Sequence, residues 1–573
     1  MGGFGSKLSS CMFSILYFIY LVVVFGVAFF SWPRYFVLVV SGFFLSGFCF
    51  LSLEDKVRLF IRLIPFFVAL PLSAHFDSLN LWRLSSIIIF LQWFWLVRED
   101  FYFHWRKILV NFRSEIAYLW KLYRVEFLWG AIIFISILSI LKAAYPLISL
   151  RRVIYFLNLS LIYFPVRYLV KKKGKDILFS FRKDFIWAAG LVILVGVFQL
   201  ITSYFLSLDS FMKFWAAKVQ LSFYGSHWSY IVRRLNTWFA YNFGSSLRLR
   251  MFSTFPDSHT FPLFLVISSA WIIWPVFRKK YCEEANKISG LFRRIKKTLE
   301  MKIDWWTGIN FVLLFISFIE IVLSGTRGIW LGLGIVYFIL FFRWVKLRKQ
   351  EVKERFYLEF SGILLIIFVL AFAYAYLFLS FPQLTTVGNF SFSQGEGLIK
   401  RVGSILNLSE TSNSGRIFIW QETIKSIVRN PFLGIGIFNF PVILRENISL
   451  TKAGATAHNL YLHIAAEIGL IGLLISGWLI YLILKRLRFL ILLKDRELSS
   501  LFFLLFFSLI WILGYSLTDA AILDERIFLE LMILAGIVGG MNYIKELKSK
   551  IKNQNDKSKV KELKSKIKGQ KSK

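Results

Sequence analysis

The segment SGTRGIWLGLGIVYF, residues 324–338, begins an apolar run with an arginine at its head. Runs of this kind recur from Phe13 to Tyr543, and a helix needs roughly 20 apolar residues to cross a hydrocarbon layer. Hydrophobic residues make up 57% of the 573-residue chain and aromatic residues 19%, with a mean hydropathy of +0.63. The core of a soluble protein of this length does not require so large a share of hydrophobic residues. The sequence therefore predicts an all-α, polytopic integral membrane bundle of about 12–14 transmembrane helices.

The basic residues predict which side of the membrane each loop faces. The formal net charge is +36, and Lys and Arg gather in the cytoplasmic loops of membrane proteins. Counted back from the Lys-rich end after Tyr543, successive basic segments are separated by two spans and lie at 485–498, 343–359, 278–305, 171–184 and 98–126. We therefore expect both ends of the chain in the cytoplasm and Arg327 on the opposite side. The loops therefore account for the positive net charge, and no nucleic-acid partner is needed to explain it.

This topology predicts two large extracytoplasmic segments. The shortest predicted spans are 59–73 and 84–97. The predicted organisation is N-terminal transmembrane helices (1–207), an extracytoplasmic segment (208–259), central transmembrane helices (260–380), a large extracytoplasmic loop between late spans (381–463), C-terminal transmembrane helices (464–544) and a Lys-rich cytoplasmic tail (545–573).

The tail contains the sequence KELKSKIK twice, at 545–552 and 561–568, with apolar residues at helical spacing. A basic amphipathic helix on anionic membrane lipids and a solubilising tail both fit this pattern. The three cysteines, Cys11, Cys49 and Cys282, are far apart, which favours neither a disulfide framework nor a thiolate metal site.

Polar residues suited to catalysis or anion binding gather on the predicted outer side. They are Arg248, Arg250, Asp257, His259, Arg327, Arg416, His458, Asp519, Asp524 and Arg526. No ATP is available outside the cytoplasm, so a reaction there must use an already activated substrate.

Residues 414–440 predict an amphipathic helix with Ser414 as N-cap, ended by Asn430–Pro431. Arg416 would lie in its first turn, where backbone N–H groups and the helix dipole favour a phosphate or pyrophosphate. A solvated surface arginine is the alternative. The Gly-Ile-Gly sequence at 434–436 predicts a tight turn rather than a phosphate loop.

His458 stands at the predicted outer mouth of a span, where it could act as an acid or base or be a hydrogen-bonded structural residue. Glu467 is nine residues further on, which on a continuous helix is about half a turn away and roughly 13 Å along the axis. The two side chains should not touch. His463 also points largely away from His458, so no metal site is predicted.

Three segments, in this order, resemble the O-antigen ligase and polymerase superfamily of integral membrane glycosyltransferases. The matching elements are Ser324-Gly325-Thr326-Arg327-Gly328, then Arg416 with Trp420 and the stretch from Asn430 to Gly436, then His458-Asn459 and the stretch from Glu467 to Leu474. Residues 248–261 resemble a further family element more loosely, because Ser253 and Asp257 replace its glycine and asparagine.

The resemblance implies a GT-C-like fold and transfer of a saccharide from undecaprenyl pyrophosphate to a sugar hydroxyl, with inversion and without a cofactor. The site would face the periplasm from the bacterial inner membrane, in lipopolysaccharide biosynthesis. Arginines would hold the pyrophosphate and His458 would take the acceptor proton. The implied catalytic residues are His458, Arg416 and Arg327, and the implied substrate-binding residues are Arg250, Arg248, Asn459 and Trp420.

The sequence leaves several activities open. A ligase joins O-antigen to lipid A core, whereas a polymerase extends the growing glycan on the polyprenyl carrier; we favour the ligase. A third member type transfers glycans to protein hydroxyls. A polysaccharide-lipid transporter would need ionisable residues near the membrane midplane and an internal repeat. The sequence contains no such repeat, although Lys142 and Arg167 remain unassigned.

Overall fold

The computed structural model describes residues 2–73, 77, 79–110, 113, 115–116, 119–120, 123–233, 238–241, 247–277, 305–346, 352–380, 383–384, 411–446 and 456–541. Helices dominate this part of the chain, and nine of its helices are long and apolar enough to cross a membrane. The predicted all-α, polytopic membrane fold is therefore confirmed. The Lys-rich tail, Cys282 and residues 278–304 of the basic segment 278–305 lie outside the described residues.

The N-terminal half begins with three helices and a short two-stranded ribbon. Its longer elements are α1 (Gly2–Phe29), α2 (Phe36–Phe50), α3 (Leu53–Leu63), β1 (Ala69–Leu70), β2 (Leu79–Asn80), α4 (Leu81–Val110), α6 (Arg124–Ser139), α7 (Pro146–Ser160), α8 (Tyr163–Lys173) and α9 (Lys175–Phe205). Shorter elements follow: α10 (Leu208–Phe214), a π-helix (Trp215–Val219), α11 (Gln220–Tyr224), α12 (Ser226–Val232) and the antiparallel pair β3 (Phe239–Tyr241) and β4 (Leu247–Leu249).

The C-terminal half supplies α13 (Phe261–Ile273), α16 (Trp305–Leu323), α17 (Arg327–Lys346), α18 (Val352–Ser380), α20 (Thr411–Arg429), α21 (Leu460–Ile491), α22 (Arg496–Tyr515) and a last helix over residues 525–541. All 13 residues of α13 are buried, and α13 packs against α9, α16 and α22. It thus forms the centre of the bundle.

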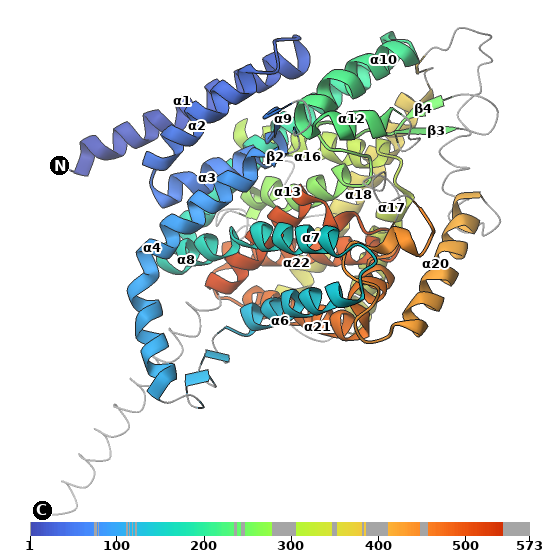
Figure 1. Cartoon of the computed structure of the whole chain (residues 1–573). Helices are drawn as coiled ribbons and strands as arrows, with labels where there is room; N and C mark the ends of the chain where they lie inside the picture. Colours follow the sequence, from blue (N-terminus) through green and yellow to red (C-terminus); the bar gives the residue numbers. More distant parts are fainter. Residues whose placement is uncertain are drawn as a thin grey trace, which may run out of the picture.

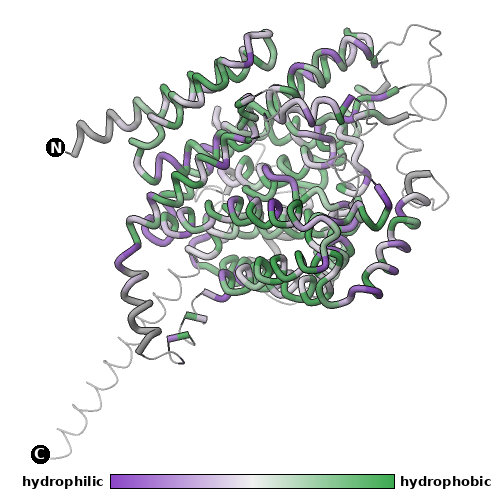
Figure 2. Tube along the Cα trace, viewed as in Figure 1, coloured by the Kyte–Doolittle hydropathy of each residue, from purple (hydrophilic) through white to green (hydrophobic). Residues whose placement is uncertain are grey.

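Figure 1 shows α20, β3 and β4 at one end of the bundle, away from the N-terminus of α1. Figure 2 shows hydrophobic residues over most of the bundle and hydrophilic residues along α20. A helix with this polarity at the end of an apolar bundle fits a position in water or at the membrane interface rather than within lipid.

The predicted span at 59–73 is wrong. Helix α3 ends at Leu63, and after Pro65 the chain enters strand β1. The α3 side chains Arg58 and Arg62 both pair with Asp184 of α9, at 3.0 and 2.5 Å. These ion pairs hold a polar amphipathic helix against α9, and proline then prevents its continuation.

Arg167, unassigned from the sequence, has a packing role. Its guanidinium pairs with Glu126 of α6, which also accepts a hydrogen bond of 2.8 Å from the Tyr163 hydroxyl. The ion pair therefore joins α6 to α8 within the bundle, and this packing role explains Arg167 without a transport pathway.

Helix α21 is broken at Ile468 and Gly469, where the backbone leaves helical geometry. The loop after α20 occupies the break: Ile435 N–H donates to Ala466 O, Gly436 N–H to Glu467 O and Leu470 N–H to Pro431 O, at 2.9, 3.0 and 2.7 Å. Gly434 and Gly436 both have positive φ, so the predicted tight turn at 434–436 is confirmed. The loop supplies the hydrogen bonds that the broken helix lacks.

Gly469→Ala should destabilise the protein by at least about 1–3 kcal/mol, the usual cost of an unfavourable backbone conformation. Gly469 has φ +75°, and an added Cβ would lie 2.0 Å from the Phe432 carbonyl oxygen. The thermal midpoint in detergent would measure the loss. Gly477 is the matched control, because it lies in the same helix and a Cβ there would meet nothing within 4 Å. Equal midpoints for the two alanine variants would contradict the proposed lock between loop and helix.

Candidate active site

The site is built around the turn between α16 and α17. Gly325 has φ +62° in this turn, and the Thr326 hydroxyl donates to the Ser258 carbonyl at 2.6 Å. A Cβ on Gly328 would lie 2.0 Å from the Thr518 hydroxyl oxygen. The small residues of this turn therefore allow close approach of two other segments, the loop before α13 and the end of α22.

Arg250 fastens the loop before α13 to this turn. Its Nε donates to the Ser324 carbonyl at 3.2 Å, and one terminal nitrogen donates to the Thr326 hydroxyl at 3.2 Å. The same terminal nitrogen lies 3.4 Å from Nε2 of His259. Burial lowers the pKa of Arg250 to about 10, so its guanidinium stays charged at neutral pH.

His259 and Asp519 extend the cluster to the loop after α22. His259 Nδ1 lies 2.9 Å from the Asp519 carboxylate and 3.2 Å from the Tyr515 hydroxyl. Burial alone would raise the pKa of Asp519, but the imidazoles of His259 and His458 hold this pKa well below its ordinary value. Asp519 is therefore an anion at neutral pH.

His458 approaches the same carboxylate from the start of α21. Its Nδ1 lies 3.9 Å from the Asp519 oxygen, and its side chain is 30% exposed. The residue has φ +44°, an uncommon conformation for a residue other than glycine. Such strain is often found at functional sites.

Asn459 and Trp420 hold the His458 loop in place. The Asn459 side chain caps α21 by accepting from the N–H groups of Tyr461 and Leu462, and its amide nitrogen donates to the Leu517 carbonyl at 3.0 Å. The Trp420 indole donates to the Ala457 carbonyl at 2.8 Å. Both side chains therefore make structural contacts next to His458.

Arg416 lies near enough to lower the pKa of Arg250 by charge repulsion, after the larger effect of burial. It is not in a first helical turn as predicted, because α20 begins at Thr411, three residues before Ser414. The end of this helix was correctly predicted, since α20 stops at Arg429. Arg416 therefore lies beyond the first turn of α20, where the helix dipole has little effect.

The other predicted arginines occupy different positions. Arg327 is the first residue of α17 and follows the turn that Arg250 holds. Arg248 is a buried residue of β4, within electrostatic range of Tyr204 at the end of α9. Arg327 is therefore next in sequence to the turn that Arg250 holds, whereas Arg248 lies near α9.

Glu467 has its own partners, as its spacing from His458 requires. One of its carboxylate oxygens lies 3.5 Å from His463 Nε2 and 3.3 Å from the Phe440 backbone nitrogen, which donates to it. In the part of the chain that the structure describes, no group of three or more His, Cys, Asp or Glu residues could hold a metal ion.

The helices and the site together define a polytopic membrane protein whose arginines, histidines and carboxylate converge at the ends of several helices. Residues 312–477 match the family model described as O-antigen ligase, which spans Arg327, Arg416 and His458. The predicted resemblance is thereby confirmed: the chain carries a domain of the O-antigen ligase superfamily. Arg250, His259 and Asp519 lie outside the matched segment. No curated protein matches the chain.

Proposed function

We propose that this protein is a ligase-type glycosyltransferase, which moves a saccharide from undecaprenyl pyrophosphate to a sugar hydroxyl of lipid A core. The observation that carries the proposal is the convergence of His458, Asp519 and Arg250 beside the Arg327 turn. Arg327 and His458 belong to the segment that matches the O-antigen ligase family. The loop before α13, the loop after α22 and the start of α21 meet there.

The chemistry needs positive charge for the leaving group and a base for the acceptor. As the acceptor oxygen attacks the anomeric carbon, the bond from that carbon to the pyrophosphate breaks and the carrier leaves with the electron pair. Arg327 and Arg416 would hold the pyrophosphate, since a guanidinium pairs with two phosphate oxygens. Arg250 contributes charge while it holds the turn. The attack inverts the anomeric centre.

His458 is better suited than His259 to accept the hydroxyl proton. Both nitrogens of His259 have neighbours, Asp519 on one side and Arg250 on the other. His458 is more exposed, 30% against 19%, and its Nδ1 faces Asp519 at 3.9 Å. The carboxylate would stabilise an imidazolium as the proton transfers, which leaves Nε2 for the acceptor.

The site would face the periplasm, where the activated lipid carrier replaces a nucleotide sugar.

A transporter is the alternative function of another class, and the position of Glu320, one of two buried carboxyl groups, helps to decide against it. Glu320 and Glu530 have no hydrogen-bond partner among the described residues. Glu320 lies four residues before Ser324, and Glu530 is the sixth residue of the 525–541 helix. Glu320 is therefore near the end of α16, whereas a transport pathway needs such groups at the midplane.

An acceptor assay tests the proposal. The purified protein would be incubated with saccharide on undecaprenyl pyrophosphate, with and without lipid A core, and products separated by size. We expect transfer only when the core is present, and transfer slowed by about 10²–10⁴ with a His458→Ala variant. Longer lipid-linked glycans without the core would indicate the polymerase instead. Absence of transfer under both conditions, with folded protein, would refute the glycosyltransferase assignment.

A further inference from the structure

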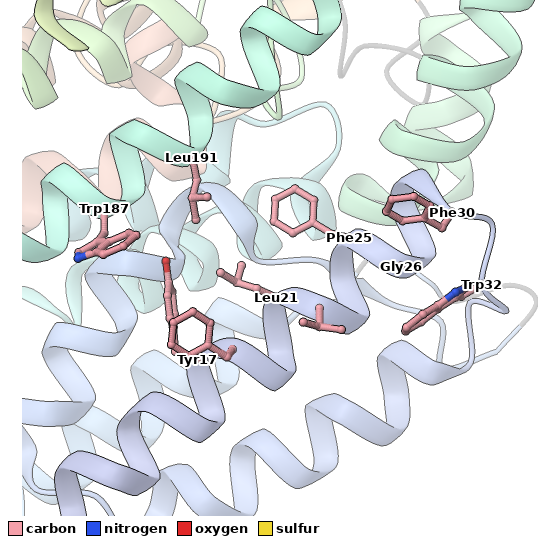
Figure 3. Close-up of a pocket in the computed structure, with 10 residues that line it drawn as sticks. Tyr17, Leu21, Phe25, Gly26, Phe30, Trp32, Trp187 and Leu191 are labelled. Carbon is pink, nitrogen blue, oxygen red and sulfur yellow. The ribbon is translucent and has the colours of Figure 1, made fainter. Parts of the chain in front are cut away.

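An apolar groove runs along α1 beside α9, remote in sequence from every residue of the candidate active site (Figure 3). Its volume is about 400 Å³. Tyr17, Leu21 and Phe25 of α1 form one wall, and Trp187 and Leu191 of α9 form the other. All of its accessible lining is apolar, which suits a hydrocarbon ligand.

A glycine shapes one end of this groove. The Trp32 ring folds back over Gly26, where an added Cβ would lie 2.3 Å from the ring atom Cε3. The Trp32 backbone N–H donates to the Gly26 carbonyl at 3.1 Å, which fixes the return of the chain. The indole therefore closes the groove only because position 26 has no side chain.

The groove opens toward lipid. Its walls belong to two candidate membrane spans, Cys11–Phe29 and Lys175–Phe205. Phe18 and Val22, which also line it, are 58% and 57% exposed. An apolar recess on a membrane-facing surface will be filled by lipid chains, because water there would be costly.

A cation marks the end of the groove that Trp32 closes. Lys218 Nζ donates to the Ser31 hydroxyl at 2.7 Å, and Ser31 lies between the lining residues Phe30 and Trp32. No carboxylate pairs with Lys218 among the residues that the structure describes. By contrast, Lys213 pairs with Asp209 at 2.5 Å and Arg34 with Asp77 at 2.6 Å. The ammonium of Lys218 is thus available to an anion.

We propose that the groove holds one anionic phospholipid, with an acyl chain between α1 and α9 and its phosphate at Lys218. The combination of an apolar recess with one unneutralised cation at its end matches the two parts of such a molecule. Helix α11 separates this groove from the active-site loop, since Gln220 donates to the Phe255 carbonyl there at 2.9 Å. In this proposal the bound lipid is a molecule separate from the sugar donor.

Thermal unfolding of the delipidated full chain in detergent tests this site. Phosphatidylglycerol should raise the midpoint by several degrees more than phosphatidylcholine, because only the former carries net negative charge. Lys218→Gln should abolish this difference, whereas the control Lys213→Gln should keep it. Leu191→Trp, which fills the groove, should remove stabilisation by both lipids. Native mass spectrometry should show one retained phosphatidylglycerol in the parent protein.

Four outcomes would overturn the proposal. Equal stabilisation by the two lipids, or an unchanged preference in Lys218→Gln, would remove the headgroup contact. An equal midpoint shift from inorganic phosphate alone would mean that the groove contributes nothing. Stronger stabilisation by undecaprenyl phosphate, lost in Lys218→Gln, would assign the groove to the carrier lipid instead. None of these readouts depends on transferase activity, so the proposed function stands or falls separately.

Discussion

His458→Ala should lower turnover by about 10²–10⁴, the usual contribution of a positioned general base. Donor affinity should change little, because the imidazole is needed mainly when the acceptor proton is transferred. The position of His458 suits proton transfer rather than donor binding, since its Nδ1 lies 3.9 Å from Asp519 and its side chain is partly exposed. Steady-state rates at varied donor concentration would give turnover and apparent affinity separately.

His227→Ala is the matched control, because His227 is an exposed histidine of α12. It should retain parental turnover. His259→Ala is more informative, since its loss removes a neighbour of both Asp519 and Arg250. It should impair donor affinity as well as turnover. Near-parental turnover in folded His458→Ala would show that another group takes the proton.

The apolar runs were sufficient to predict the class of fold, because each helix must satisfy its backbone within lipid. They were not sufficient at 59–73. The ion pairs of Arg58 and Arg62 with Asp184 join residues more than 120 positions apart, and no local pattern in the sequence indicates them. Span predictions therefore failed where tertiary ion pairs stabilise a polar helix inside the bundle.

The candidate site was predictable only in part. His259 and Asp519 were both among the polar residues of the predicted outer side, but their contact joins positions 260 residues apart, which no motif spacing indicates. Asn459 stays a predicted substrate-binding residue, and the structure adds that its side chain caps α21 and donates to the Leu517 carbonyl. A residue beside a candidate base can thus serve the loop that carries the base.

Arg416→Lys should reduce kcat/KM by roughly tenfold to a hundredfold. Lysine keeps the charge but loses the planar fork that pairs with two phosphate oxygens, and a hydrogen bond to a charged group contributes about 1.5–3 kcal/mol. Arg416→Ala should be worse, with both donor affinity and turnover reduced, because the positive charge near Arg250 is also lost. Donor titrations of the two variants would separate these effects.

Arg429→Lys provides the control, because Arg429 is an exposed arginine in the last turn of the same helix. Its activity should be unchanged. A solvated surface arginine at 416 would tolerate lysine equally well, so parental kinetics in Arg416→Lys would remove this residue from the pyrophosphate site. That result would leave Arg327 as the principal guanidinium, because it follows directly on the turn that Arg250 and Ser258 hold.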